Sequence, residues 1–354
     1  MVLDNSTVSN NQTSENSDLD YARKISLVIY CVAFVLGPIG NGLVIYVTGC
    51  RIKKTVNSVW FLNLALADFL FTSLLLLYII NISRNYEWPF GDFLCKLNTM
   101  VTVVNMFASI FLLVAISLDR FLSTWVVVWA QNQRTTLKAE VICVVIWLTS
   151  FVCSLPYTLV RKTEIFEKKE YCNYSSLMDN ITYKKILVIF RFLVGFLVPF
   201  LIITGSYVAI ALRASRLQRG KKRRSLRIII SIVLAFFICW MPFHVFMLLE
   251  MSESYKQGNS WLGQGITLAA SFAFLNSCLN PILYVFMCDE FQVKLRQSVL
   301  LVFESAFAED HGMSLGSSRS LSSHLSRISR RSESAPAEQK DETGTSLITC
   351  QIVK

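Results

Sequence analysis

The chain has 354 residues, of which 53% are hydrophobic and only 16% are charged. Soluble domains usually carry about 25% charged residues, so this chain lacks the charge needed to cover a water-facing surface. Its formal net charge of +10 could suggest nucleic-acid binding, but the bases gather in short links between apolar stretches. An anionic lipid surface explains them there, and we expect no nucleic-acid partner.

Seven long apolar stretches follow one another along the chain. Each is near or above the roughly 20 residues that a helix needs to cross about 30 Å of hydrocarbon. Because backbone polar groups in lipid must bond internally, the pattern predicts an all-α fold, a seven-transmembrane helix bundle over residues 26–287. The predicted spans are 26–49, 59–82, 97–118, 141–160, 186–212, 228–249 and 262–287.

The distribution of Lys and Arg predicts the orientation. The first link holds Arg51, Lys53 and Lys54 without an acid, and the link RASRLQRGKKRRSLR between spans five and six holds eight bases and no acid. The links on the other side mix acids and bases. Since basic links stay in the cytoplasm, we expect a multi-pass plasma-membrane protein with its C-terminus inside and residues 1–25 as an extracellular tail without a cleavable signal peptide.

Glycosylation sequons agree with this orientation. Four Asn-X-Ser/Thr triplets all lie on the predicted outer side, although any one of them can arise by chance. The candidate acceptors are Asn5, Asn11, Asn173 and Asn180.

The ten cysteines divide by predicted location. Most lie inside spans, where a thiol behaves as a small hydrophobe, or at the reducing cytoplasmic side. Only Cys95 and Cys172 are left outside, where a bridge between them would hold the loop after the fourth span over the mouth of the bundle. Two free thiols are the alternative, which an oxidising compartment disfavours. No Cys/His spacing predicts a metal site.

Polar residues inside the spans are costly and usually functional. Asp68 is the only charge in the second span, with Asn41 in the first span and Asn280 in the seventh. Three such groups at similar depth could share waters or a cation, so a sodium ion near Asp68 is the one cofactor we consider. The alternative is a purely structural cluster of hydrogen bonds.

Prolines interrupt the later spans. Pro199 lies in the fifth span, Pro242 follows Trp240 in the sixth, and Pro281 follows Asn280 in the seventh. Proline removes a backbone bond and kinks a helix. A kink beside a bulky Trp could couple the ligand site to helix tilt, whereas packing alone is the simpler interpretation.

Isolated charges mark both ends of the bundle. Arg191 lies in the outer third of the fifth span without an acid at helical spacing, and Arg161 lies just beyond the fourth span. Arg191 either reaches toward the interface or awaits an anionic ligand group. At the other end, Asp119 and Arg120 stand side by side after a span without any charge.

Several motifs occur together in one order: Gly40-Asn41, LALAD ending at Asp68, the two outer cysteines, Asp119–Phe121, CWMP at Cys239–Pro242 and NPILY at Asn280–Tyr284. In this order the chain resembles rhodopsin-like G-protein-coupled receptors over about residues 26–303. The stretches WPFGDFLCK, NMFASIFLL, WAQNQRT and FLNSCLNPILYVF narrow the resemblance to the chemoattractant group. That group contains the chemerin, formyl-peptide, anaphylatoxin and chemoattractant-type prostaglandin D2 receptors.

The resemblance implies roles for particular residues. At rest Asp119 would hold Arg120, which would move to meet the G protein on activation. Arg191 and Arg161 would receive a ligand carboxylate, with candidate walls at Tyr174, Phe243 and Trp88. The implied activation residues are Asp68, Asp119, Arg120, Trp240, Pro242, Asn280, Pro281 and Tyr284.

The chain also departs from the family pattern. Val127 replaces the proline usual in the second cytoplasmic loop, which bears on contacts with the G protein. Val103 and Leu187 replace an acid and an arginine of the formyl-peptide receptors, which disfavours formyl-peptide recognition.

The segment after the bundle reads as two parts. Residues 288–305 place apolar side chains at a spacing of four and predict an amphipathic helix on membrane lipid of the inner leaflet. Residues 306–354 are Ser-rich and predicted to be disordered. Phosphorylation there would, by resemblance, recruit arrestin, whereas a plain solvated tail is the alternative. The candidate sites are Ser326, Ser329, Ser332 and Ser334.

We therefore expect a receptor for an extracellular ligand with an anionic end, a chemerin-like peptide first, that signals through an inhibitory-class G protein. The alternatives are a receptor for prostaglandin D2 or another lipid acid, a formyl-peptide or anaphylatoxin receptor, and a weakly signalling decoy. A transporter would need internal repeats and glycine-broken spans, which the sequence lacks. An enzyme would need a nucleophile–base pair or a His cluster, so we expect none.

Overall fold

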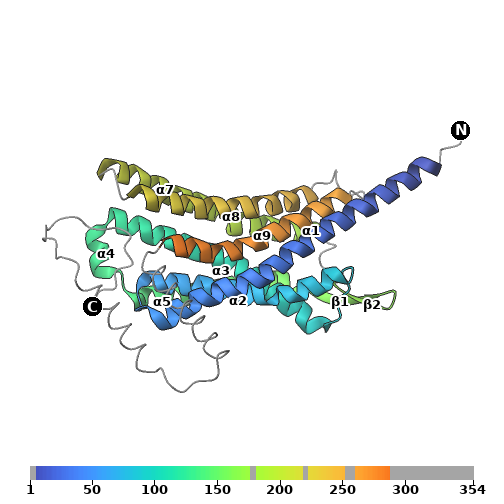
Figure 1. Ribbon diagram of the computed structural model, residues 1–354, viewed down its shortest axis with the longest axis horizontal. Helices are drawn as coiled ribbons and strands as arrows, with labels where there is room; N and C mark the ends of the chain where they lie inside the picture. The colour runs from blue at the N-terminus through green and yellow to red at the C-terminus, as the bar shows by residue number, and fades with distance from the viewer. Residues whose placement is uncertain (1–4, 176–180, 218–221, 252–259, 288–354) are drawn as a thin grey trace, which may run out of the picture.

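The computed structural model describes residues 5–175, 181–217, 222–251 and 260–287. Long helices lie lengthwise beside one another in Figure 1, and the first of them projects beyond the others at the N-terminal end. The helical elements are α1 (Asn5–Tyr46), η1 (Val47–Arg51), α2 (Val56–Ser83), α3 (Gly91–Trp125), α4 (Val127–Gln133), α5 (Thr136–Leu159), α6 (Ile181–Phe192), η3 (Leu193–Leu197), α7 (Val198–Leu217), α8 (Lys222–Glu250) and α9 (Ser260–Met287). The predicted helix bundle is confirmed.

The lengths of these helices suit a membrane. Among the described residues, six helical segments are long and apolar enough to cross a bilayer, and Leu234–Glu250 of α8 is a shorter apolar helix. The six are Asp20–Arg51, Val56–Ser83, Gly91–Trp125, Thr136–Leu159, Ile181–Arg213 and Trp261–Pro281. Each contains a large part of one of the predicted spans.

The ends of the helices follow local signals only in part. A capping box between Thr55 and Ser58 starts α2, and the Thr135 hydroxyl accepts from the Lys138 amide at the start of α5. Two ends differ from the prediction. α3 continues past the Asp119-Arg120 pair to Trp125, and α1 begins at Asn5 within the segment expected to be a tail.

Close helix contacts fix the bundle around α1, α2 and α9. A Cβ at Gly37 would lie 2.5 Å from Thr72 Cγ2, and one at Gly40 would lie 3.1 Å from Pro281 Cγ. Small residues allow such approaches in membranes, where packing rather than water drives association. Further in, α3 packs against α2, α5 and α7. Its Phe107 is fully buried.

The link after α5 is a hairpin that the all-α prediction did not foresee. Strands β1 (Arg161–Phe166) and β2 (Lys169–Tyr174) pair antiparallel, with Arg161 opposite Tyr174 and Phe166 opposite Lys169. Glu167 and Lys168 form the two-residue turn with φ of 49° and 66°. Two left-handed residues give the turn whose twist matches paired strands.

Proline shapes the helix that carries Arg191. The π-turn η3 separates α6 from α7, and Pro199 lies just after it. Proline cannot donate a backbone bond to the turn before it, and a π-turn is one way to accommodate that loss. Pro242 and Pro281 lie inside α8 and α9. Pro199, Pro242 and Pro281 therefore lie within helices, as the sequence indicated.

Candidate functional site

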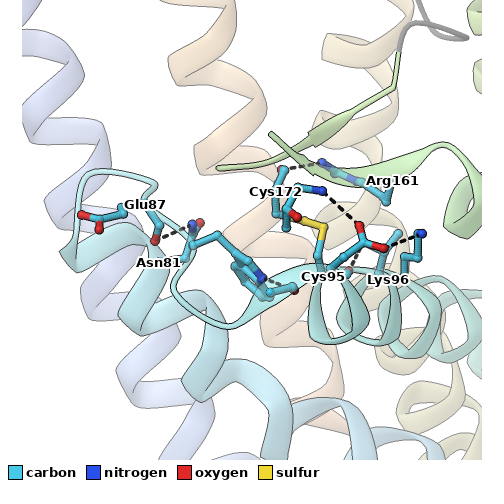
Figure 2. Close-up of a disulfide and its surroundings, with 11 residues drawn as sticks. Asn81, Glu87, Cys95, Lys96, Arg161 and Cys172 are labelled. Atoms are coloured by element: carbon cyan, nitrogen blue, oxygen red, sulfur yellow. Dashed lines mark hydrogen bonds and ion pairs between the residues drawn. A yellow bond between two sulfur atoms is a disulfide. The ribbon is translucent and has the colours of Figure 1, made fainter. Parts of the chain in front are cut away.

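A disulfide anchors the hairpin to the bundle. Cys95 near the start of α3 and Cys172 in β2 are bonded, with their Cα atoms 5.7 Å apart, which confirms the predicted bridge. Figure 2 shows the bridge between the helix and the strand, with Arg161 close by on the hairpin. Asp92 Oδ1 also accepts from the Thr163 amide at 3.1 Å. The hairpin is thus held at one end of the bundle, here called the hairpin end.

Arg161 is oriented by the hairpin itself. Its Cζ atom lies 3.7 Å from the ring centroid of Tyr174, its partner in the strand register. One guanidinium nitrogen donates to the Cys172 carbonyl at 3.2 Å, while the buried Nε atom has no hydrogen-bond partner. The Arg161 cation, and more weakly Arg191, lowers the pKa of the Tyr174 hydroxyl. Two cations therefore act on the same hydroxyl.

Arg191 lies over aromatic rings. Its Cζ atom is 4.3 Å from the ring centroid of Tyr157 and 5.7 Å from that of Phe243. Nε is buried without a partner, and Arg191 makes no ion pair with any residue that the structure describes. A guanidinium held on ring faces keeps its N–H edges for another acceptor, and a carboxylate matches that edge. This placement favours the ligand interpretation over reach toward the interface.

The structure places one predicted wall residue beside Arg191 and another away from it. Phe243 borders Arg191, as expected for a wall. Trp88 is 2% exposed, and its indole nitrogen donates to the Gly91 carbonyl at 3.0 Å. Its own amide donates to the Glu170 carbonyl at 2.6 Å. Trp88 therefore packs beneath the hairpin, and we remove it from the candidate ligand contacts.

Inside the bundle, Asp68 joins three helices. Asn280 Nδ2 donates to Asp68 Oδ2 at 2.7 Å, and the Ser109 hydroxyl donates to Oδ1 at 3.4 Å. With its amide turned to satisfy its neighbours, Asn105 donates to Oδ1 at 3.2 Å. Asn41 joins indirectly, since it donates to the Ser277 carbonyl at 3.0 Å. Of the three residues predicted to lie together, Asp68 and Asn280 are bonded directly, whereas Asn41 bonds the Ser277 backbone and not Asp68.

The Asp68 cluster has the chemistry of a cation site. Asp68 is fully buried and has no cationic partner among the residues that the structure describes. Its neighbours offer the hydroxyls of Ser109 and Ser277. Carboxylate, hydroxyl and amide oxygens are the ligands that hard cations take. The residues present therefore fit a sodium ion, which would supply the missing positive charge.

The Asp119-Arg120 pair differs from the expectation. Asp119 binds Arg134 through two bonds, Nε to Oδ1 at 2.8 Å and Nη2 to Oδ2 at 2.9 Å. Arg120 instead donates to Asn57 Oδ1 at 2.8 Å, and Arg134 reaches the same oxygen at 2.5 Å. Adjacent residues on a helix do not face each other, whereas Arg134 arrives from the following loop. Arg120 is therefore not held by Asp119 in this structure.

We predict a strong coupling between Asp119 and Arg134. Two parallel charge-assisted bonds in a mostly buried setting should contribute about 1–3 kcal/mol to the unfolding free energy. Asp119→Asn and Arg134→Gln should each lower the melting temperature of the purified protein, and the double variant should lose less than their sum. Strict additivity in this double-mutant cycle would contradict the pair. The matched control is Lys138→Gln, an exposed base on the next helix.

Trp240 lies in an aromatic array. It is 7% exposed, and its indole Nε1 has no hydrogen-bond partner within the described part of the chain. Its ring neighbours include Phe236 at 6.0 Å, Phe243 at 6.1 Å and His244 at 6.2 Å. Pro242 lies within this stretch of α8. Tyr284 belongs to α9, but its side chain is outside the described part.

Sequence reasoning missed several residues of these networks. Arg134 stood out only as one more base in a cytoplasmic link. Tyr157, Asn105 and His244 lie in apolar stretches, where a single polar residue is most simply read as part of the core. A pattern of one polar residue per turn on the inner face of α3 could have indicated Asn105 and Ser109.

The proposed modification sites are mostly beyond the described residues. Asn173 is exposed on β2, where a glycan could be accommodated. Asn5 and Asn11 lie in α1, but their side chains are not described. Asn180, the predicted amphipathic helix and the serine sites of the tail lie outside the described residues.

Comparison with known proteins supports one family. A family model described as the 7 transmembrane receptor (rhodopsin family) matches residues 40–284. The C3a anaphylatoxin chemotactic receptor of Danio rerio is 41% identical over 81% of this chain and 79% of its own length. Chemerin-like receptor 1 of Homo sapiens is 40% identical over 81% of each chain. Prostaglandin D2 receptor 2 of Mus musculus is 38% identical over 85% of this chain and 82% of its own.

These matches confirm the resemblance that the motifs indicated. Receptors of this kind are multi-pass proteins of the plasma membrane that bind an extracellular ligand and couple to a G protein, and they are not enzymes. The family model spans well over half of the chain, and the relatives align over most of their length. The chain therefore belongs to the rhodopsin family of seven-transmembrane receptors, and within it to the chemoattractant group.

Proposed function

We propose that this receptor binds the carboxylate end of an extracellular peptide, chemerin-like in the first instance, between Arg161 and Arg191. The N-terminus and the hairpin end then face outward, and the Asp119 end faces the cytoplasm. Binding favours an open cytoplasmic face that activates an inhibitory-class G protein. Phosphorylation of the serine-rich tail then recruits arrestin.

The observation that best supports this proposal is that Arg161 and Arg191 stack on aromatic rings and keep hydrogen-bond donors unused by the described residues. Both lie on ring faces near the hairpin, and each has a buried Nε atom without a partner. A nearby base, Lys184, is by contrast already paired with Glu250 at 2.8 Å. Two cations without acidic partners in the described part of the chain attract an anion, and a bidentate guanidinium–carboxylate pair is both strong and directional.

Other ligands with the same chemistry remain as alternatives. A lipid acid such as prostaglandin D2 also ends in a carboxylate, and one relative of similar identity is a prostaglandin D2 receptor. A second relative is an anaphylatoxin receptor. Formyl peptides are the weakest alternative, because Val103 and Leu187 are buried apolar residues here. A decoy would bind without G-protein coupling, an option that Val127 in the second cytoplasmic loop supports.

A panel of ligands on cells tests the proposal. Chemerin C-terminal peptides, prostaglandin D2 and formyl peptides are applied to cells that express the receptor, and cAMP suppression and arrestin recruitment are measured. A response to the chemerin peptide in both assays supports the proposal. Arrestin recruitment without cAMP suppression supports the decoy, and a response to prostaglandin D2 alone supports the lipid alternative.

We predict that Arg191→Ala weakens the active ligand by about 2 kcal/mol or more, roughly a 30-fold rise in Kd, because a charge-assisted bond is lost. Amidation of the ligand's carboxylate should have the same effect, and the two changes together should add little. Competition binding on membranes measures both. Lys162→Ala, which removes a half-exposed base beside Arg161 that already pairs with Glu164 at 2.8 Å, is the control. An unchanged Kd for Arg191→Ala would remove this residue from the site.

A further inference from the structure

A buried histidine lies in the aromatic array that contains Phe243 and Trp240. His244 in α8 is 2% exposed, and its Nε2 atom has no hydrogen-bond partner among the residues that the structure describes. Imidazole nitrogens can donate or accept, and burying one unbonded costs free energy. Such an atom in a folded protein calls for an explanation, and a bound water, an ion or a ligand group would supply one. His244 therefore points to a partner that is not part of the described chain.

The surroundings of His244 are aromatic rather than polar. Its ring centroid lies 4.8 Å from that of Phe196, 5.6 Å from Phe243 and 5.9 Å from Phe192. Phenyl rings pack against the imidazole but provide no hydrogen bond in its plane. Gly195 in the π-turn η3, next to Phe196, adds no side chain to this region. The protein thus shapes the space around Nε2 without satisfying it.

The Phe243 ring lies near both His244 and the Arg191 guanidinium. The same phenyl ring that lies 5.6 Å from His244 lies 5.7 Å from the Arg191 guanidinium. Trp240 lies 6.2 Å from His244 and 6.1 Å from Phe243, and its Nε1 atom is also without a partner among the described residues. Three unbonded polar atoms, one each on Arg191, His244 and Trp240, therefore follow one aromatic array. Such a series suits a ligand with a charged end and a polar group further in.

We propose that His244 Nε2 is a second anchor for the ligand, which hydrogen-bonds a hydroxyl, carbonyl or amide group set inward from the carboxylate at Arg191. This inference rests on the proposed function and narrows its ligand class. The receptor selects a peptide C-terminus or an oxygenated lipid acid over a plain fatty acid, because only the former satisfy the imidazole.

The test measures binding of a chemerin C-terminal peptide and of prostaglandin D2 to wild-type receptor, His244→Phe and His244→Gln. Phenylalanine keeps the ring packing but cannot hydrogen-bond, so the affinity of whichever probe binds should fall about tenfold. Glutamine can still donate and accept, so its loss should stay within about threefold. Arachidonate, a fatty acid without hydroxyl or ketone groups, should bind weakly and be insensitive to His244→Phe.

Melting temperatures of the ligand-free variants separate anchoring from structure. A ligand anchor predicts that ligand-free His244→Phe is as stable as wild type or more stable, because a buried unbonded atom has been removed. Unchanged affinity in His244→Phe overturns the inference, as does an equal loss in both variants or a loss of stability that matches the loss of affinity. If Arg191→Ala weakens binding and His244→Phe does not, only the second anchor fails. If wild type binds neither peptide nor prostaglandin D2, the proposed function fails and the inference with it.

Discussion

Replacing Cys95 and Cys172 together by serine should destabilise the hairpin end and abolish high-affinity ligand binding. The bridge closes a loop with a sequence separation of 77 residues. In the chain-entropy model such a cross-link stabilises the folded protein by about 4–5 kcal/mol. Arg161 and Tyr174 both lie within a few strand positions of Cys172. Their placement over the bundle therefore depends on the bridge.

The hairpin would not be wholly free without the disulfide. The Thr163 amide still bonds Asp92, and Trp88 still donates to the Glu170 carbonyl. The neutral bond to the Glu170 carbonyl contributes about 0.5–1.5 kcal/mol and the bond to the Asp92 carboxylate about 1.5–3 kcal/mol, so each is weaker than the bridge. Thermal unfolding of purified receptor and peptide binding on membranes measure the outcome, with Cys31→Ser as the control that removes a thiol without a bridge. A double-serine variant with wild-type melting temperature and Kd would show that the other contacts suffice.

The bundle could be predicted because hydrocarbon imposes a simple rule on the sequence. A span must be apolar over about 20 residues, and that length is visible without any knowledge of packing. This rule identifies the residues that lie in the hydrocarbon, but it does not predict where each helix begins or ends. α3 continues to Trp125 beyond the charged pair, since its backbone bonds do not depend on whether lipid or water surrounds them. Likewise α1 begins at Asn5, because a polar composition describes solvent contact and not backbone conformation.

The hairpin escaped prediction because its signals are weak. Its strands are six residues each, and the turn residues Glu167 and Lys168 are not the Asn or Gly that usually mark such turns. The disulfide was predictable by location, since only two cysteines lay on the outer side. Its consequence for Arg161, which stacks on Tyr174 across the strand pair, required the register.

Some site residues could be predicted because a charge is rare in an apolar span, whereas others could be identified only from the packing of the helices. Asp68 and Arg191 stood out because charge is rare in an apolar span. Their partners did not, since Asn105 and Tyr157 come from other helices whose rotation the sequence does not state. The pairing of Asp119 with Arg134 likewise depends on how the loop after α3 folds back.

Asp68→Asn should reduce agonist-driven G-protein coupling about 100-fold while ligand binding persists. The carboxylate accepts from Asn280 of α9 and Ser109 of α3, and bonds to a charged acceptor contribute about 1.5–3 kcal/mol each. An amide has the same shape but one acceptor oxygen and no charge. Asp68→Asn should therefore destabilise the arrangement of α2, α3 and α9 that depends on the carboxylate charge. The population of the signalling state should shift as a result.

The readouts for Asp68→Asn are G-protein activation, ligand Kd and the dependence of Kd on sodium chloride against choline chloride. If Asp68 holds a sodium ion, wild type responds to the exchange of salts and the variant does not. Thr72→Val is the matched control, since the Thr72 hydroxyl bonds backbone carbonyls of its own helix and links no others. Full coupling in a well-expressed Asp68→Asn variant would mean that shape alone suffices at this position. The Asp68 carboxylate, which accepts only from neutral donors, would then have a structural role alone. The group that switches between two arrangements on activation would have to lie elsewhere, and the Asp119–Arg134 pair is the next candidate.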